Sequence, residues 1–148
     1  MYDIIIFEGL DRSGKTTTKK EMERLTNYKY ICIDRLYLTA ICYEKIKNRK
    51  NNINDYYNQF KKLCKHFKVL IVYCKISNSE IIKKRIIKEN EKILFTKEVD
   101  LLIKYYDEEI EKLLKNKQCD IYVFNADKCS ELKHYHNQAI KLVKEINL

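Results

Sequence analysis

The chain contains two glycines, and both fall within one phrase, Phe-Glu-Gly-Leu-Asp-Arg-Ser-Gly-Lys-Thr-Thr, at residues 7–17. Gly9 and Gly14 stand five residues apart, and Lys15 and Thr16 follow. This G-x-x-x-x-G-K-T pattern is typical of a loop that wraps phosphate with inward-pointing backbone N–H groups, and residues without a Cβ allow its tight turns. The pattern predicts a P-loop in which Lys15 reaches the β and γ phosphates of a nucleotide and the Thr16 hydroxyl binds Mg²⁺.

The segments on either side of the loop fit the setting that this motif requires. Residues 3–7 form a short apolar run, Asp-Ile-Ile-Ile-Phe, which favours a buried parallel strand. Residues 16–25 are rich in helix formers, with Met22 and Leu25 spaced for one face. We therefore expect a strand, the loop and a helix in succession.

The rest of the chain alternates short apolar runs with amphipathic stretches. Further strands are expected at residues 30–33, 69–74 and 121–124. Helices are expected at residues 38–47, 55–65, 79–89, 96–115 and 130–146, the last four capped by Asn54, Ser79, Thr96 and Ser130. Residues 48–52 and 88–95 are polar or charged connections. This alternation predicts an α/β fold, a three-layer P-loop sandwich with a short parallel sheet and helices on both faces, in one domain over residues 1–148.

Charged residues follow the ends of the first two predicted strands, where ligands bind in open parallel sheets. Asp34 could hold Mg²⁺ as a Walker-B carboxylate does, and Arg35 could grip phosphate; the alternatives are a strand-ending aspartate and a surface arginine. Glu8 could act as a base on a substrate hydroxyl or order metal-bound water. Asp11 and Arg12 project from the loop, and Arg12 could neutralise a transferring phosphoryl group or simply be solvated.

Composition limits the other functions that the chain could have. Cys32 and Cys74 lie in predicted buried strands, and the six cysteines form no C-x-x-C pair, which favours free thiols in a reducing cytosol. The net charge of +9 favours anionic partners such as nucleotides. We expect a cytoplasmic protein without a membrane span or a signal peptide, because no apolar run is long enough and the first strand starts at once. The histidines lack ligand partners at a useful spacing and receive no role: His66, His134 and His136.

The phrase at residues 7–17 resembles the P-loop of thymidylate kinases almost letter for letter. Residues 34–39, with Cys42 and Tyr43, resemble the Asp-Arg-aromatic segment of that superfamily, which small phage-type deoxynucleotide kinases also carry. Later segments are similar to family counterparts in the same order: a strand at 69–74, the basic helix before the lid at 79–88, and the last strand with its adenine-contacting loop at 124–127.

The resemblance implies a transferase of nucleotide biosynthesis that uses ATP and Mg²⁺ to phosphorylate a (deoxy)nucleoside monophosphate. Arg12 and Lys15 would serve the transferring group, Asp11 and Glu8 would face the acceptor, and Asp34 and Arg35 would serve the metal and the acceptor phosphate. Thr16 would also bind the metal. The ATP-binding set would be Gly9, Asp11, Arg12, Ser13, Gly14, Lys15, Thr16, Thr17, Asn125 and Ala126. A homodimer is compatible with this assignment.

Two departures from the family pattern leave the acceptor open. The family's Asp-Arg-x-Pro substrate strand is missing, because only residues 26–29 separate the first helix from the second strand and the chain has no proline. The segment at 88–95 lacks arginine, and Arg85 is the nearest one. In this family an arginine in the P-loop, here Arg12, can replace the lid arginine.

Three other functions therefore stand beside the monophosphate kinase. One is a kinase for a nucleoside or polynucleotide 5′-hydroxyl, with Glu8 as its base and a basic cluster at residues 45–50. Another is a non-catalytic ATP-binding protein that regulates a partner. A nucleic-acid-binding module is the least favoured, because the aromatic residues lie at core spacing without an interleaved basic stripe.

Overall fold

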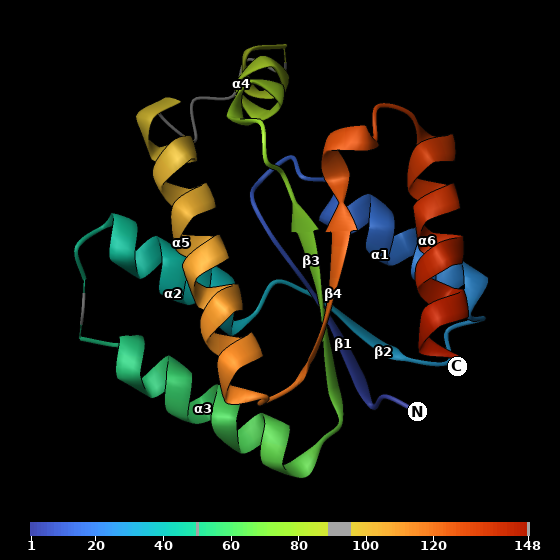
Figure 1. The fold of residues 1–148 in the computed structure, drawn as a ribbon, viewed down its shortest axis with the longest axis horizontal. Coiled ribbons are helices and arrows are strands. Elements are labelled where there is room, and N and C mark those ends of the chain that lie inside the picture. Colours follow the sequence, from blue (N-terminus) through green and yellow to red (C-terminus); the bar gives the residue numbers. More distant parts are fainter. Residues whose placement is uncertain (50, 89–95, 148) are drawn as a thin grey trace.

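The computed structural model describes residues 1–49, 51–88 and 96–147, and across them four parallel strands form one sheet. The strand order is β2-β1-β3-β4 (Figure 1). The bounds are β1 (Ile4–Glu8), β2 (Ile31–Asp34), β3 (Val69–Lys75) and β4 (Asp120–Asn125). Each strand falls within one or two residues of its predicted position.

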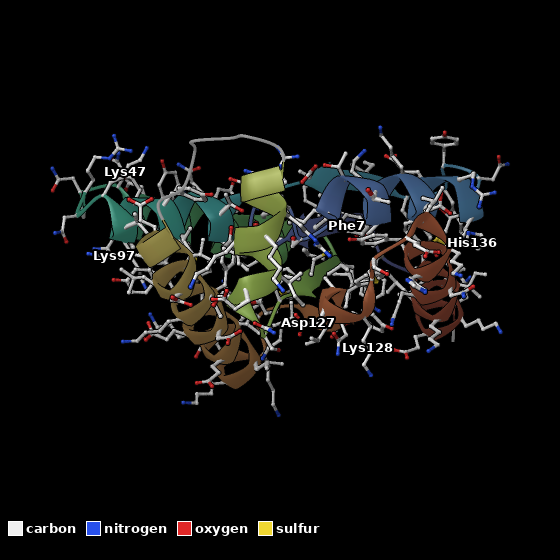
Figure 2. The ribbon with its side chains drawn as sticks, turned by 90° about the horizontal axis from the view of Figure 1, so that it is seen from above. Phe7, Lys47, Lys97, Asp127, Lys128 and His136 are labelled. Atoms are coloured by element: carbon white, nitrogen blue, oxygen red, sulfur yellow. The ribbon has the colours of Figure 1, made fainter. Side chains whose placement is uncertain are left out.

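Helices cover both faces of this sheet, as Figure 1 shows. On one side lie α1 and α6, which pack on each other, and on the other side lie α2, α3 and α5. α4 stands beyond the carboxyl ends of β3 and β4, and Figure 2 looks down on this end of the molecule. The bounds are α1 (Lys15–Leu25), α2 (Tyr37–Ile46), α3 (Ile53–His66), α4 (Ser79–Lys88), α5 (Thr96–Asn116), α6 (Leu132–Ile146) and the short 3₁₀ helix η1 (Ala126–Lys128). The predicted α/β fold is confirmed.

The core follows from the strand order. β1 is buried along its whole length, and β3 is buried except at Lys75, because each has a strand on either side and helices on both faces. Cys74 is buried as expected, whereas Cys32 is only partly buried because β2 is an edge strand. All six cysteines are free thiols.

The strand register brings the predicted site residues to one edge of the sheet. Phe7 of β1 pairs with Asp34 of β2 and with Val72 of β3, and Asn125 ends β4 opposite Lys75. The P-loop therefore leaves the sheet at its centre, with Asp34 on one side and the β4–α6 connection beyond β3 on the other. No helix within the described ranges is long and apolar enough to cross a membrane.

Three predicted caps are wrong, those at the starts of α3, α4 and α6. α3 begins at Ile53, so Asn54 lies inside its first turn. At α4, Asn78 accepts the backbone N–H of Glu80, which makes Ser79 the first helical residue.

At α6, Glu131 rather than Ser130 is the cap, and it shares a capping box with His134. His134 therefore has a structural role that its spacing in the sequence did not indicate. α5 starts at Thr96 as predicted, but the cap by the Thr96 side chain, the helix end at Glu89 and the connection at 89–95 lie outside what the structure describes.

Candidate functional site

The two glycines allow close backbone contacts at the ends of the loop. Gly9 has a φ of +143°, and a Cβ there would lie 2.7 Å from the carbonyl oxygen of Cys74 in β3. Gly14 has a φ of +81°, and a Cβ there would lie 2.2 Å from a ring carbon of Tyr135 in α6. Both conformations are unfavourable for residues with side chains. The loop therefore presses against β3 on one side and against α6 on the other.

Lys15 begins α1 and lies inside the loop, where its side chain is buried. Its ammonium group donates a hydrogen bond to the carbonyl oxygen of Leu10, and among the described residues it forms no ion pair. Burial, followed by the nearby charge of Arg35, lowers the pKa of Lys15 to about 8. A buried ammonium group without a carboxylate partner favours an anion at this position.

The backbone and the hydroxyl groups of the loop add to this preference. Three threonines, Thr16 to Thr18, follow Lys15 in the first turn of α1, so its N-terminal N–H groups face no carboxylate of their own turn. The hydroxyl oxygen of Ser13 is buried and has no partner among the described residues. The Ser13 hydroxyl and the N-terminal N–H groups of α1 thus add donors suited to phosphate at the loop.

Thr16 and Asp34 meet at the side of the loop. The Thr16 hydroxyl donates a 2.7 Å hydrogen bond to Oδ2 of Asp34, while the buried Oδ1 has no partner among the described residues. No described group of three or more His, Cys, Asp or Glu side chains could hold a metal alone. A hydroxyl and a carboxylate with a spare oxygen fit Mg²⁺, which proteins usually hold through one or two side chains together with substrate phosphates.

Arg35 and Asp11 form an ion pair at the mouth of the site. Arg35 has a φ of +64°, and its backbone N–H donates to the carbonyl oxygen of Phe7 at 2.9 Å, which fixes the turn after β2. The Tyr43 hydroxyl, from α2, donates to the other oxygen of Asp11 at 2.9 Å. These contacts place a half-exposed guanidinium group next to the P-loop.

Glu8 lies beneath the amino end of α2 rather than in the open mouth of the site. Its carboxylate is 1% exposed and accepts hydrogen bonds from the backbone N–H groups of Leu36, Leu38 and Thr39. It also accepts one from the Thr39 hydroxyl, which in turn contacts the hydroxyl of Tyr106. Burial raises the pKa of Glu8, and the four donors oppose this by favouring the carboxylate. Both carboxylate oxygens are occupied by the helix.

Arg85 of α4 joins two parts of the predicted nucleotide site. Its guanidinium group donates to the carbonyl oxygens of Arg12, at 2.5 Å, and Cys129, at 2.8 Å. Asp127 accepts from the backbone N–H of Ser77 at 2.9 and 3.0 Å, which ties η1 to the start of α4. Asn125 is exposed at the end of β4 and Ala126 is buried in η1, so the predicted adenine loop lies beside α4.

The remaining loop residues lie where the motif places them, and several contributors were missed. Arg12 has a left-handed backbone with a φ of +65°, and Thr17 is partly buried in the first turn of α1. Four side chains received no individual role from the sequence, although three of them lie in segments that it singled out, because their contacts join elements that are apart in the chain. The four are Thr39, Tyr43, Arg85 and Tyr135.

Comparison with known proteins gives likenesses in structure. No protein-family model matches the chain, and no curated sequence does. The YorR protein from Bacillus subtilis, solved in complex with phosphorylated GDP, has a TM-score of 0.65 and 18% identity, with 97% of each chain covered. Deoxyadenosine kinase from M. mycoides with bound dCTP has a TM-score of 0.70 and 13% identity, covering 96% of this chain and 99% of that one. The same kinase with bound dATP has a TM-score of 0.64 and 13% identity, covering 100% of both chains.

These likenesses establish the fold. At 13–18% identity they show that the parallel sheet and its flanking helices are arranged as in YorR and in deoxyadenosine kinase. The chemistry depends on the residues at the carboxyl edge of the sheet.

Proposed function

We propose that this protein is a kinase that transfers the γ-phosphoryl group of ATP, with Mg²⁺, to a (deoxy)nucleoside monophosphate, as thymidylate kinases do. The observation that carries the proposal is the meeting of Lys15, Thr16 and Asp34 at one loop. A buried ammonium group, a hydroxyl and a carboxylate with an unpaired oxygen lie together there. This set suits a magnesium-bound triphosphate.

Each residue has a distinct task in this proposal. The loop N–H groups and Lys15 bind the β and γ phosphates, and Thr16 and Asp34 hold the metal, which when bound neutralises phosphate charge. Arg12, from the loop itself, stabilises charge on the transferring group. Asn125 and Ala126 would contact the base of ATP.

The charged residues at the mouth of the site favour one class of acceptor substrate. Glu8 is fully engaged by α2, so it is poorly placed to remove a proton from a hydroxyl acceptor. Arg35 is a half-exposed cation beside the loop and suits an acceptor phosphate. A phosphate acceptor at neutral pH is already ionised and needs no base. These two observations favour a monophosphate acceptor.

A deoxynucleoside kinase is the second candidate, and Asp11 is the observation that favours it. This partly exposed carboxylate projects from the loop, and it could accept a proton from a substrate hydroxyl after releasing Arg35 or Tyr43. The likeness to deoxyadenosine kinase is compatible with this alternative.

An acceptor assay tests the choice. The protein would be incubated with γ-labelled ATP, Mg²⁺ and, separately, each deoxynucleoside monophosphate, each deoxynucleoside and a 5′-hydroxyl oligonucleotide. We expect label on a monophosphate, and we expect Lys15→Ala to reduce transfer by at least a hundredfold because it removes the ammonium group that faces the phosphates. Lys19→Ala, one turn along α1 and outside the loop, is the matched control.

The other outcomes separate the alternatives. Label on a deoxynucleoside or an oligonucleotide, lost in Asp11→Asn, would replace the monophosphate with a hydroxyl acceptor. Binding of ATP without any transfer that depends on Lys15 would favour a regulatory protein that has lost catalysis.

A further inference from the structure

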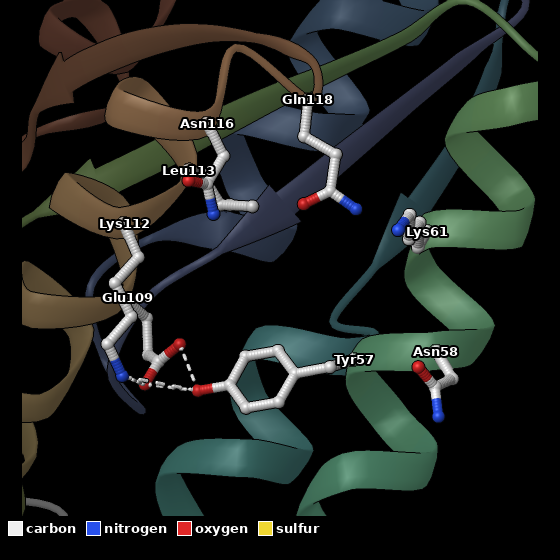
Figure 3. Close-up of a pocket in the computed structure, with 8 residues that line it drawn as sticks. All are labelled: Tyr57, Asn58, Lys61, Glu109, Lys112, Leu113, Asn116 and Gln118. Carbon is white, nitrogen blue, oxygen red and sulfur yellow. Dashed lines mark hydrogen bonds and ion pairs between the residues drawn. The ribbon is translucent and has the colours of Figure 1, made fainter.

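A second recess lies between α3 and α5, at the opposite edge of the sheet from the P-loop (Figure 3). This α3–α5 pocket has a volume of about 320 Å³. α3 ends at His66, just before β3 starts, and the pocket residue Gln118 lies two residues before the start of β4. The pocket is therefore beside the amino ends of the strands, whereas the P-loop follows the carboxyl end of β1. The two sites are separate.

A buried carboxylate lies in the wall of the α3–α5 pocket. Glu109 is 1% exposed and accepts hydrogen bonds from the Tyr57 hydroxyl at 2.6 and 2.7 Å and from Lys112 at 3.1 Å. It also pairs with Lys45, which reaches it from α2. Figure 3 shows the side chains of Tyr57, Glu109 and Lys112 meeting between the two helices. Because two ammonium groups face one carboxylate, the wall carries a net positive charge.

Further lysines add to this charge from α3. Lys61 lines the pocket and also an adjoining recess of about 350 Å³, which Lys62 and Lys65 line as well. None of these three lysines pairs with a carboxylate in the part of the chain that the structure describes. Lys61 and Lys65 stand four residues apart on one helix, and like charges at that spacing repel each other. The helix dipole favours a cation in the last turn, where Lys65 lies, but not at Lys61.

Neutral hydrogen-bonding groups complete the lining. Asn58, Asn116 and Gln118 place side-chain amides around the pocket, and these amides have no hydrogen-bond partner among the described residues. Each amide can both donate and accept. The pocket thus combines one unpaired cation, Lys61, and one shared cation, Lys112, with unpaired amides.

We propose that the α3–α5 pocket is a second binding site, which takes a small phosphorylated anion through Lys61 and Lys112. Phosphate carries high charge density and several acceptor oxygens, which lysines approaching from two helices can share. The amides suit the neutral part of such a ligand. A polynucleotide is a poorer match, because backbone binding requires a basic track that continues along the surface, whereas this recess is bounded by two helices. The ligand could be a nucleotide or an inorganic phosphate, and both share this chemistry.

The pocket is linked to the other end of the molecule through α2. Lys45 connects Glu109 to α2, and the amino end of the same helix holds Glu8 and Thr39 beneath the P-loop. If a ligand draws Lys112 away from Glu109, the Glu109 carboxylate keeps only Lys45 and Tyr57 as partners. We therefore expect binding to perturb α2 as well as the pocket.

Amide ¹H–¹⁵N spectra of the whole chain test the proposal, since they separate this pocket from the P-loop in one titration. The probes are inorganic pyrophosphate and dTMP, added separately. We expect saturable shifts at Lys61, Lys112 and Gln118, a further shift at Lys45, and an affinity at least fivefold lower in Lys61→Gln. Lys61 has no partner to lose, so this variant should fold normally. Lys115→Gln is the matched control. Lys115 lies near Lys112 at the carboxyl end of α5 but does not line the pocket, so losing its charge should leave the affinity unchanged.

Each possible outcome of the titration either supports or overturns the proposal. Equal binding of the two probes supports a phosphate site, and tighter binding of dTMP supports a nucleotide site. Absence of saturable shifts at the pocket up to millimolar probe would overturn the proposal. So would equal weakening by Lys61→Gln and Lys115→Gln, because that result means diffuse attraction. A 5′-hydroxyl oligonucleotide serves as a third probe, and if it bound more strongly than the other two, with shifts spread over Lys61, Lys62 and Lys65, the proposal would also be overturned.

Discussion

At the scale of single residues, Lys15 should link nucleotide binding to proton uptake. Burial lowers its pKa to about 8 in the free protein, and phosphates placed around it should raise this pKa toward the usual lysine value of about 10.4. Near pH 6 the lysine is protonated in both states, so binding takes up no proton. At pH 9 the free lysine is largely neutral and the bound one charged, so binding takes up most of one proton and affinity falls as pH rises.

Calorimetry at pH 9 in two buffers of different ionisation enthalpy measures this uptake. The two apparent enthalpies should differ in proportion to the proton taken up. Lys15→Arg keeps the charge at every accessible pH, so it should abolish the difference. Identical heats for the natural protein in both buffers would contradict the expected role of Lys15.

Single residues also show which parts of the candidate site could be predicted from the sequence. Gly9, Gly14, Lys15 and Thr16 are found from one contiguous phrase, because the chemistry of the loop is local. Tyr135 could not be found this way, because its contact with Gly14 depends on how α6 docks on α1. A residue's role was predictable where its partners are its neighbours in the chain.

At the scale of elements, Glu8 should matter through α2. Its carboxylate accepts three N–H groups that would otherwise be unsatisfied at the start of a buried helix. Glu8→Gln places an amide N–H₂ against these donors and should lower the free energy of unfolding by about 1–3 kcal/mol. Urea denaturation followed by circular dichroism measures the change.

Glu80→Gln is the matched control, because Glu80 is exposed on α4 and its pair with Lys83 should contribute little. Under the monophosphate proposal, Glu8→Gln should slow transfer only a few-fold. Unchanged stability together with a collapse of transfer would instead identify Glu8 as a base and favour a hydroxyl acceptor.

The starts of several helices were predicted less well than the strands. The strands were predictable because β1 and β3 are continuous apolar runs between two helical layers. The starts of α3 and α6 were missed by two residues and the capping residue of α4 by one, since several polar residues near each start could serve as a cap. At α6 the cap is Glu131, because His134 completes a capping box with it.

At the scale of the whole molecule, ligand binding at the P-loop should stabilise the entire fold. The loop joins the central strand to α1 and touches β3 and α6, so a nucleotide bound there favours the folded over the unfolded chain. ATP with Mg²⁺ at a hundred times its Kd should add about 2.7 kcal/mol, which for a domain of this size raises the Tm by roughly 5–10 °C. Differential scanning calorimetry measures the shift.

Removing the metal tests the pairing of Thr16 with Asp34 in the same measurement. EDTA should reduce the shift that ATP produces, because the metal neutralises phosphate charge next to the Asp34 carboxylate. In Asp34→Asn the shift should become insensitive to Mg²⁺, since one ligand has lost its charge. Asp55→Asn, an exposed change of the same kind on α3, should keep the full dependence on Mg²⁺. If Asp34→Asn retained that dependence, the metal would have to be held elsewhere, and the meeting of Lys15, Thr16 and Asp34 would no longer account for nucleotide binding.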